Sequence, residues 1–268
     1  MWSTTSCLRI LFLLLLQASV DVDGMSSEVL FKEGEKNNFS MGFHHYRMGL
    51  RGYGAGHPVH GCKCQKDPVL PEEIVCACRG PGVKDFKANL TRGVTRLSLE
   101  SVSMSVLRSG TLQIFRGSLK DLVLDRVKEL TEIEDGAFYG LHMLRTISIK
   151  QAPKLKTIQD AVFNCHLPNL KIIRIIQSGL EAVPSLEHVE TKSIIYMVDL
   201  DSNKINNLPT GSVKMKTEML NLDFNLIGRI ESHAFDGSEI AKLSLKGNSQ
   251  LNSIHEDAFS GLKNVRTL

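Results

Sequence analysis

Apolar residues recur along this chain in short alternating segments of the form L-x-x-L-x-L. An apolar–polar–apolar alternation has the period of two that is typical of a strand with one buried face. The centres of seven such segments lie at 97–99, 122–124, 147–149, 173–175, 198–200, 220–222 and 243–245. Successive centres end 22 to 26 residues apart, and an eighth strand is expected between Val265 and Leu268.

This interval predicts a solenoid of leucine-rich repeats, because about 20–29 residues make up one repeat of that kind. Each repeat would add one strand to a curved parallel sheet on the concave face. The chain would then return along the convex side in irregular or short helical segments. We therefore expect an α/β-type solenoid over residues 94–268, with about seven repeats and a truncated eighth. Such a surface suits the binding of a partner better than catalysis in a cleft.

Two further signals repeat with the strands. Several convex returns end in Ala-Phe or Val-Phe, and these rings are predicted to stack as a spine in the core. They are Phe138, Phe163, Phe235 and Phe259, with Phe115 in the same role in the first repeat. Three repeats place an asparagine after the strand, namely Asn203, Asn225 and Asn248. A buried amide there can satisfy backbone groups of its own turn and of the next repeat.

The N-terminal segment is typical of a secretory signal over residues 1–24. Arg9 supplies the positive charge, the apolar run at 10–16 follows, and small residues such as Ala18 offer a cleavage site. The run is only 7 residues long, which is too short to span a membrane. Residues 25–61 are rich in glycine and histidine and are expected to form a flexible arm.

Four cysteines precede the repeats in a C-x-C…C-x-C arrangement within residues 62–93. They are Cys62, Cys64, Cys76 and Cys78. This spacing would indicate zinc in a cytosolic protein, but in an exported chain ahead of such repeats it predicts a disulfide cap. A cap is needed because the first repeat has no neighbour to cover its apolar end and its strand edge. The sequence leaves three pairings open, but C-x-C neighbours rarely bond each other, so both bonds are expected to link the first pair with the second.

Three other positions relate to export and assembly. Cys165 is left without a partner in the cap, and we interpret it as a small buried apolar residue. A disulfide to another subunit is the alternative. Asn38 and Asn89 each begin an N-x-S/T sequon and are expected to be glycosylated.

The composition excludes several other classes of function. The net charge is +3 over 268 residues, which is too small to favour nucleic acid as a partner. There is no phosphate-binding loop and no G-x-S-x-G motif, and His255-Glu256 lacks the second histidine of H-E-x-x-H. Four histidines in the arm suggest a metal, but a solvated tail is favoured because no second shell is evident. We therefore expect no enzyme activity, no cofactor and no metal site.

The later repeats resemble one receptor family. LPNL at 167–170, SGL at 178–180 and VPSL at 183–186 closely resemble the middle repeats of the glycoprotein-hormone receptors. These are leucine-rich-repeat G-protein-coupled receptors of the follitropin, lutropin and thyrotropin type. The segments 231–237 and 243–259 continue the similarity, which covers about residues 119–268 well.

The resemblance implies a hormone-binding ectodomain. In that family the concave strands bind a cystine-knot heterodimeric hormone, and a hinge and seven membrane helices that activate a G protein follow. No hinge cysteine cluster or membrane segment occurs in this sequence, and a stop at Leu268 would leave the last repeat uncapped, so we expect an incomplete chain. The protein would then be a plasma-membrane receptor, or a secreted protein if it ends there. The alternative is a secreted adhesion, matrix or decoy protein, although such proteins usually end in a cysteine cap.

The strand register predicts which side chains face a partner. Charges cluster by sign on neighbouring strands, and apolar residues lie beside them, as is typical of a protein-binding patch. A solvated face of mixed charge is the alternative. The candidate ligand-binding residues are Lys150, Ile172, Arg174, Ile176, Met197, Asp199, Asp201, Met219, Asn221, Asp223, Lys242 and Lys246. Replacing Asp199 and Asp223 together by lysine is expected to weaken hormone binding and to leave secretion intact.

Overall fold

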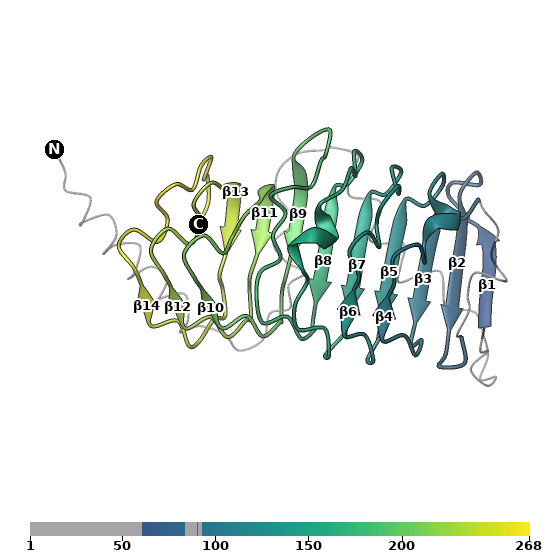
Figure 1. Cartoon of the computed structure of the whole chain (residues 1–268), viewed down its shortest axis with the longest axis horizontal. Helices are drawn as coiled ribbons and strands as arrows, with labels where there is room; N and C mark the ends of the chain where they lie inside the picture. The colour runs from purple at the N-terminus through teal and green to yellow at the C-terminus, as the bar shows by residue number, and fades with distance from the viewer. Residues whose placement is uncertain (1–60, 84–89, 91–92) are drawn as a thin grey trace.

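The computed structural model describes residues 61–83, 90 and 93–268. These residues form an elongated solenoid whose strands follow one another along its length (Figure 1). The signal at 1–24, residues 25–60 of the arm and both sequon asparagines, Asn38 and Asn89, lie outside the described residues.

A nine-stranded sheet lines the whole solenoid in the order β1-β2-β3-β5-β7-β8-β9-β11-β13 (Figure 1). Only the first pair is antiparallel, and every later neighbour is parallel. The strands are β1 (Gly61–Lys66), β2 (Ile74–Arg79), β3 (Arg96–Glu100), β5 (Asp121–Asp125), β7 (Thr146–Lys150), β8 (Ile172–Ile176), β9 (Ile195–Asp199), β11 (Lys216–Asn221) and β13 (Glu239–Ser244). The predicted leucine-rich-repeat architecture is therefore confirmed, with one strand in each of the seven repeats.

The convex returns contain only short elements, as expected. Two 3-10 turns lie at η4 (Gln113–Phe115) and η5 (Asp160–Phe163). Two-residue strands form two small parallel sheets behind the main one. They are β4 (Val106–Leu107) with β6 (Glu132–Ile133), and β10 (Asn207–Leu208), β12 (Arg229–Ile230) and β14 (Ser253–Ile254).

The truncated eighth strand expected at the end of the sequence forms only in part. Lys263 and Thr267 make isolated bridges to β13, and their carbonyl oxygens accept from Ile240 N at 3.1 Å and from Leu243 N at 3.0 Å. Val265 and Leu268 are exposed, with 42% and 38% of their surface accessible.

The cap is a disulfide-bonded hairpin, and both bonds link the first cysteine pair with the second, as predicted. Cys62 bonds to Cys78, and Cys64 bonds to Cys76. Cys76 and Cys78 are fully buried and lie opposite Leu97 and Leu99 of β3. The hairpin thus covers the apolar end of the first repeat, which is the role the sequence assigned to it.

An ion-pair network ties the cap to the first repeats. Glu73 is 2% exposed and accepts a hydrogen bond from the Lys120 ammonium group at 2.9 Å. Arg145 approaches the same carboxylate at 3.5 Å, and Arg96 pairs with Asp67 at 3.3 Å. Burial of a carboxylate is costly without such partners.

The phenylalanine spine forms in two separate stacks. Phe138 stacks on Phe163 with ring centroids 5.7 Å apart, and Phe235 stacks on Phe259 at 5.4 Å. Phe115 is fully buried in the first repeat. Between the stacks, the two proline-bearing returns fill the core with smaller apolar side chains, which are Leu180, Leu186, Ile205 and Leu208.

Cys165 is buried and free of disulfide bonds. Burial raises the pKa of its thiol to about 11, and the Glu190 carboxylate contributes in the same direction. A buried thiol that stays protonated is unreactive, which agrees with its interpretation as a small core residue.

The asparagines after the strands form a buried ladder, but it runs in the opposite direction to the one expected. The Asn225 amide donates to Leu200 O and Leu222 O, both at 3.0 Å, and its Oδ1 accepts from Ile205 N at 3.2 Å. Leu200 and Ile205 belong to the preceding repeat. Asn203 and Asn248 bond in the same pattern.

Replacing Asn225 by alanine is expected to lower the free energy of unfolding by about 1–3 kcal/mol, because it leaves buried backbone groups of two repeats without partners. Chemical denaturation followed by circular dichroism measures this loss. Asn206→Ala, at an exposed asparagine one repeat earlier, is the matched control and should change stability by less than about 0.5 kcal/mol. Equal losses for the two variants would contradict the role of the ladder.

Candidate ligand-binding face

Strands β8, β9 and β11 bring most of the predicted site residues together on the concave face. Their register places Ile172, Met197 and Met219 in one row, with Lys242 of β13 next to them. A second row contains Arg174, Asp199 and Asn221. Lys150 and Ile176 lie opposite each other at the carboxyl ends of β7 and β8. Asp201, Asp223 and Lys246 follow the strands β9, β11 and β13 at that same edge.

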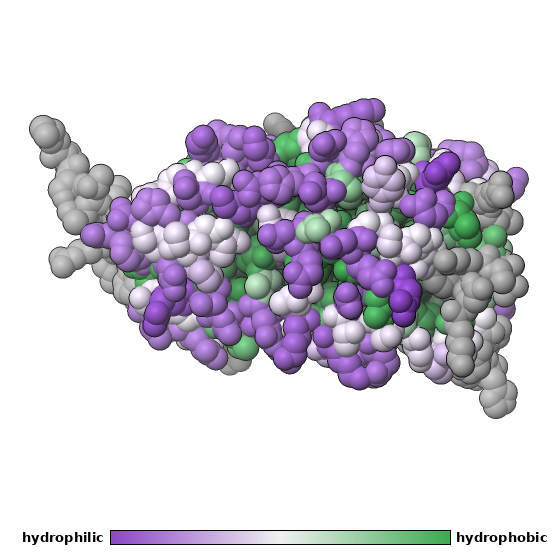
Figure 2. Space-filling model, viewed as in Figure 1, coloured by the Kyte–Doolittle hydropathy of each residue, from purple (hydrophilic) through white to green (hydrophobic). Residues whose placement is uncertain are grey.

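The first row gives the face an apolar stripe. Ile172, Met197 and Met219 are half-buried and sit on adjacent strands, which are about 4.8 Å apart in a sheet. Figure 2 shows hydrophilic residues over most of the solenoid surface in view, with hydrophobic residues in smaller patches between them. A partner that covers the stripe would remove these side chains from water.

A bulge at the start of the strands adds a residue that the sequence pattern missed. Lys171 N and Ile172 N both donate to Arg145 O, and Tyr196 N and Met197 N both donate to Lys171 O at 2.9 and 3.2 Å. Two residues of one strand therefore oppose one residue of the next, which turns an extra side chain outward. Tyr196 is 53% exposed for this reason, although strict alternation would bury it.

Asp199 is a structural anchor rather than an accessible contact. It is 6% exposed, its Oδ2 accepts from Arg174 Nε at 2.9 Å, and its Oδ1 accepts from Asn221 Nδ2 at 3.0 Å. A lysine at this position could accept neither hydrogen bond, and it would place a second cation beside Arg174. Asp199→Lys would therefore disturb folding as well as binding, so Asp201 is the better position for a reversal of charge.

Asp201 and Asp223 stay partly exposed at the carboxyl edge of the sheet. Asp201 accepts a hydrogen bond from the Ser202 hydroxyl at 2.7 Å. Asp223 accepts from the Ser244 hydroxyl at 2.6 Å and from Lys246 N at 2.7 Å. Among the residues that the structure describes, neither carboxylate has an ion pair with a basic side chain. Both can therefore accept a basic group from a partner.

Burial is the main influence on the charges of this face. It raises the pKa of Asp201 and of Asp223, and the Asp199 carboxylate contributes in the same direction. Arg174 acts against this rise at Asp201, and Lys246 acts against it at Asp223. Burial and the Arg174 guanidinium lower the pKa of Lys150. Half-buried like charges that shift one another's pKa are common at functional sites.

Asp201→Asn is expected to raise the melting temperature at pH 7. A pKa raised in the folded state means that the folded protein binds the proton more tightly than the unfolded chain does, so the ionised carboxylate opposes folding. The gain should shrink as the pH falls through the raised pKa and vanish below the ordinary aspartate value of about 3.9. Thermal unfolding between pH 3.5 and 8 measures it. Asp135→Asn, at an exposed convex position, should show no such dependence, and a similar gain there would contradict the explanation.

Phe224 extends the face beyond the sheet. Its ring is 51% exposed, and its backbone adopts a left-handed φ of 52°. Every repeat makes this turn, and the equivalent residue in the last complete repeat is Gly247. A side chain at Gly247 would lie 2.5 Å from Phe224 Cδ1, so glycine is needed where the ring packs. The sequence signal for this exposed ring was the phenylalanine in Asp223-Phe224-Asn225. The alternation of apolar and polar residues predicts which side chains of a strand are buried, but it does not apply to residues in turns.

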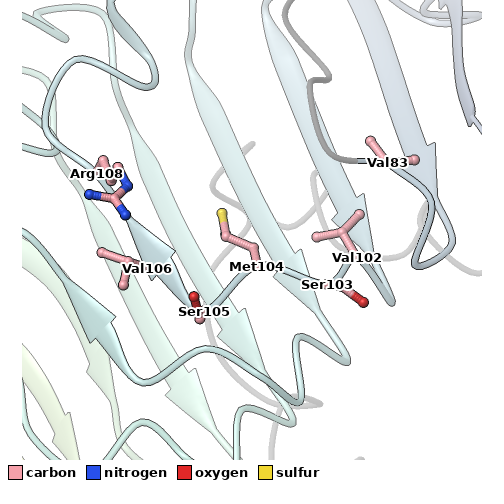
Figure 3. Close-up of a pocket in the computed structure, with 7 residues that line it drawn as sticks. All are labelled: Val83, Val102, Ser103, Met104, Ser105, Val106 and Arg108. Atoms are coloured by element: carbon pink, nitrogen blue, oxygen red, sulfur yellow. The ribbon is translucent and has the colours of Figure 1, made fainter.

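Two pockets lie outside this cluster of charges. One of about 200 Å³ sits beside the cap, where Met104, Val106 and Arg108 line it together with Val83 (Figure 3). Another of about 440 Å³ lies at the opposite end, between Ile194, Ala241 and Val265.

Within residues 61–83, 90 and 93–268, no three histidine, cysteine, aspartate or glutamate side chains are arranged to hold a metal ion. No helix in this part of the chain is long and apolar enough to cross a membrane.

Two family models match the repeat region. The Leucine rich repeat model covers residues 216–268, and the BspA type Leucine rich repeat region (6 copies) model covers residues 115–185. The chain is a leucine-rich-repeat protein. Among solved structures, this leucine-rich-repeat chain is similar to a chain of the TLR13–ssRNA13 complex, with a TM-score of 0.40 and 14% identity over 76% of this chain and 35% of that chain.

Curated relatives confirm the resemblance to the glycoprotein-hormone receptors. The chain is 27% identical to the thyrotropin receptor of Sus scrofa over 143 residues, which are 52% of this chain and 19% of that protein. The Mus musculus thyrotropin receptor gives the same values. The lutropin-choriogonadotropic hormone receptor of Sus scrofa is 30% identical over 209 residues, which are 73% of this chain and 29% of that protein. The leucine-rich-repeat chain thus spans less than a third of the length of these relatives.

Proposed function

We propose that this chain is the hormone-binding ectodomain of a glycoprotein-hormone-receptor-like protein. It captures a cystine-knot heterodimeric hormone on the concave face of β8, β9 and β11. The observation that supports this best is the apolar stripe beside Asp201 and Asp223, two partly exposed carboxylates that make no salt bridge among the described residues. The relatives that match the repeat region are named as a thyrotropin receptor and a lutropin-choriogonadotropic hormone receptor.

Two parts of the face contribute to binding in different ways. The stripe of Ile172, Met197 and Met219, with Tyr196 beside it, supplies apolar area whose burial stabilises the complex. Asp201 and Asp223 attract basic groups of the hormone and speed its association, because charges at the rim of an interface affect the on-rate most. Lys242 and Lys246 are exposed at one side of the face and disfavour a basic approach there.

The same proposal implies that the chain is extracellular and that it belongs to a longer receptor. The two disulfides suit an extracellular chain. In our proposal residues 1–24 are removed on export, and Asn38 and Asn89 bear glycans. Coupling to a G protein through seven membrane helices belongs to regions outside the 268 residues and is proposed for the whole receptor.

Binding to purified hormones tests the proposal. The secreted chain is passed over immobilised thyrotropin, lutropin and follitropin, and saturable binding to at least one of them is expected. Each hormone after reduction and unfolding serves as the control surface, because the cystine knot is then lost. Absence of binding to every native hormone, or equal binding to the reduced ones, would contradict the proposed function.

A further inference from the structure

Two histidine rings meet on neighbouring returns, outside the strands of the concave face. His142 lies on the return that leads into β7, and His166 lies on the next return, which leads into β8. Their ring centroids are 5.5 Å apart, with an angle of 60° between the ring planes. Both side chains are exposed. The fold therefore brings two imidazoles from different repeats within reach of one ligand.

A carboxylate from a third return orients the His166 ring. Glu190 Oε2 lies 3.1 Å from His166 Nδ1. An ionised carboxylate can only accept a hydrogen bond, so Nδ1 of the neutral ring carries the hydrogen and Nε2 keeps its electron pair. Histidines that bind metals usually donate their other ring N–H to a carboxylate in this way. The arrangement leaves Nε2 of His166 available as a ligand atom.

Hydrogen bonds to the backbone hold the three returns together around these side chains. Leu167 N donates to Glu190 O at 2.9 Å, and Glu190 N donates to Cys165 O at 3.1 Å. These two bonds flank the histidine of the second return. The Asn169 side-chain amide donates to His142 O at 2.7 Å and ties the first return to the second. Ligands on segments that are already fixed lose little conformational entropy when an ion binds.

The separation of the rings suits a shared metal ion. A Zn–N bond of about 2.0–2.1 Å places the centre of a bound imidazole about 3.2 Å from the ion. Two such rings at a tetrahedral angle have centroids about 5.2 Å apart, which is close to the observed 5.5 Å. Because both side chains are exposed, their rings can rotate toward one point. Zinc, copper and nickel accept imidazole ligands, whereas magnesium and calcium prefer oxygen.

We propose that His142 and His166 together bind one divalent ion that prefers nitrogen ligands, such as zinc, and that Glu190 is a positioning residue for His166. Among the described residues no third side chain of the ligating types joins these two, so water completes the coordination. The ion links two consecutive returns, the same two whose phenylalanines, Phe138 and Phe163, stack in the core. It therefore stabilises the middle of the solenoid, with or without a hormone.

The sequence alone predicts no metal site at these positions, because they match no ligand motif. His142, His166 and Glu190 are spaced by 24 residues, which is about one repeat. Only the stacking of repeats brings them side by side. Ligand residues that recur at the repeat length are the signal that could have revealed the site.

Carbethoxylation of histidines, read by mass spectrometry, tests the site in the full secreted chain. Diethyl pyrocarbonate modifies an accessible imidazole nitrogen, and a bound ion blocks that nitrogen. Increasing ZnCl2 is expected to protect His142 and His166 together, with one midpoint. His188 and His255, which are exposed on other returns, should stay reactive. MgCl2 at the same concentrations should protect none of the four.

Two variants separate the ligands from the positioning residue. His142→Gln should remove the protection of His166, because one imidazole alone holds the ion poorly. Glu190→Gln should raise the zinc concentration that half-protects His142 about tenfold. A purely structural role of Glu190 would leave that midpoint unchanged, since its printed side-chain contact is with the other ring. Circular dichroism of each variant confirms that it is folded.

Thermal unfolding gives a second readout. ZnCl2 at about 100 times its Kd should raise the melting temperature by about 5–10 °C. His142→Gln with His166→Gln should lose this rise, and the matched pair His188→Gln with His255→Gln should keep it. Absence of protection at about 1 mM ZnCl2, independent protection of the two histidines, or a rise that survives the first pair would each overturn the proposal. No hormone enters these measurements, so their failure leaves the proposed function as it stands.

Discussion

Phe138→Ala is expected to lower the free energy of unfolding by about 3–5 kcal/mol, the range for removing a buried phenylalanine. The ring is fully buried and stacks on Phe163 at 5.7 Å. Each repeat contacts only its neighbours, so a cavity between two repeats weakens the interface on which cooperative folding depends. Guanidinium denaturation followed by circular dichroism measures the loss.

Phe224→Ala is the control for this prediction, because it removes the same atoms from an exposed ring. It should change stability by less than about 1 kcal/mol. If both variants lose the same stability, the buried spine does not hold the solenoid together. If neither loses stability, the repeats would have to collapse around the missing ring.

The second large effect concerns binding. Asp201→Lys combined with Asp223→Asn is expected to weaken hormone binding by about tenfold to a hundredfold, chiefly through slower association. Lysine at 201 reverses the charge at the less anchored carboxylate. Asparagine at 223 keeps an oxygen in place for the Ser244 hydroxyl and Lys246 N. Surface plasmon resonance at two salt concentrations gives both rate constants.

A pair of convex substitutions makes the matching change in charge elsewhere. Asp135→Lys with Asp236→Asn alters exposed residues of the returns and should leave both rate constants within twofold of wild type. Loss of the salt dependence in the concave variant alone would support steering by the acidic edge. Equal weakening by both pairs would mean that net charge, and not this face, attracts the hormone.

The repeat architecture was predictable because each strand is encoded locally. Leu97 and Leu99 lie in the core for the same reason as Leu122 and Leu124, namely a period of two within a longer fixed interval. The disulfide cap followed from the unprotected end of such a stack. The last segment pairs with β13 only in part, and its apolar residues Val265 and Leu268 remain exposed there.

The site was predictable only in part. The alternation of apolar and polar residues placed Met197 and Met219 on the concave face. It could not show that Asp199 is buried and accepts hydrogen bonds from two neighbouring strands. Tyr196 was missed because a bulge breaks the alternation, and Phe224 because it sits in a left-handed turn. The exposure of these two side chains depends on the hydrogen bonds between adjacent repeats. No single segment of the sequence contains that information.

Hydroxyl-radical footprinting with bound hormone tests the central claim most directly. Methionine side chains oxidise readily to sulfoxides, and the chain offers two on the concave stripe, Met197 and Met219, and an exposed one on a return, Met143, which is 40% accessible. The account predicts that bound hormone protects Met197, Met219 and Tyr196 and leaves Met143 as reactive as in the free chain. Protection of Met143 with unchanged oxidation of the two stripe methionines would place the hormone on another surface and contradict the account.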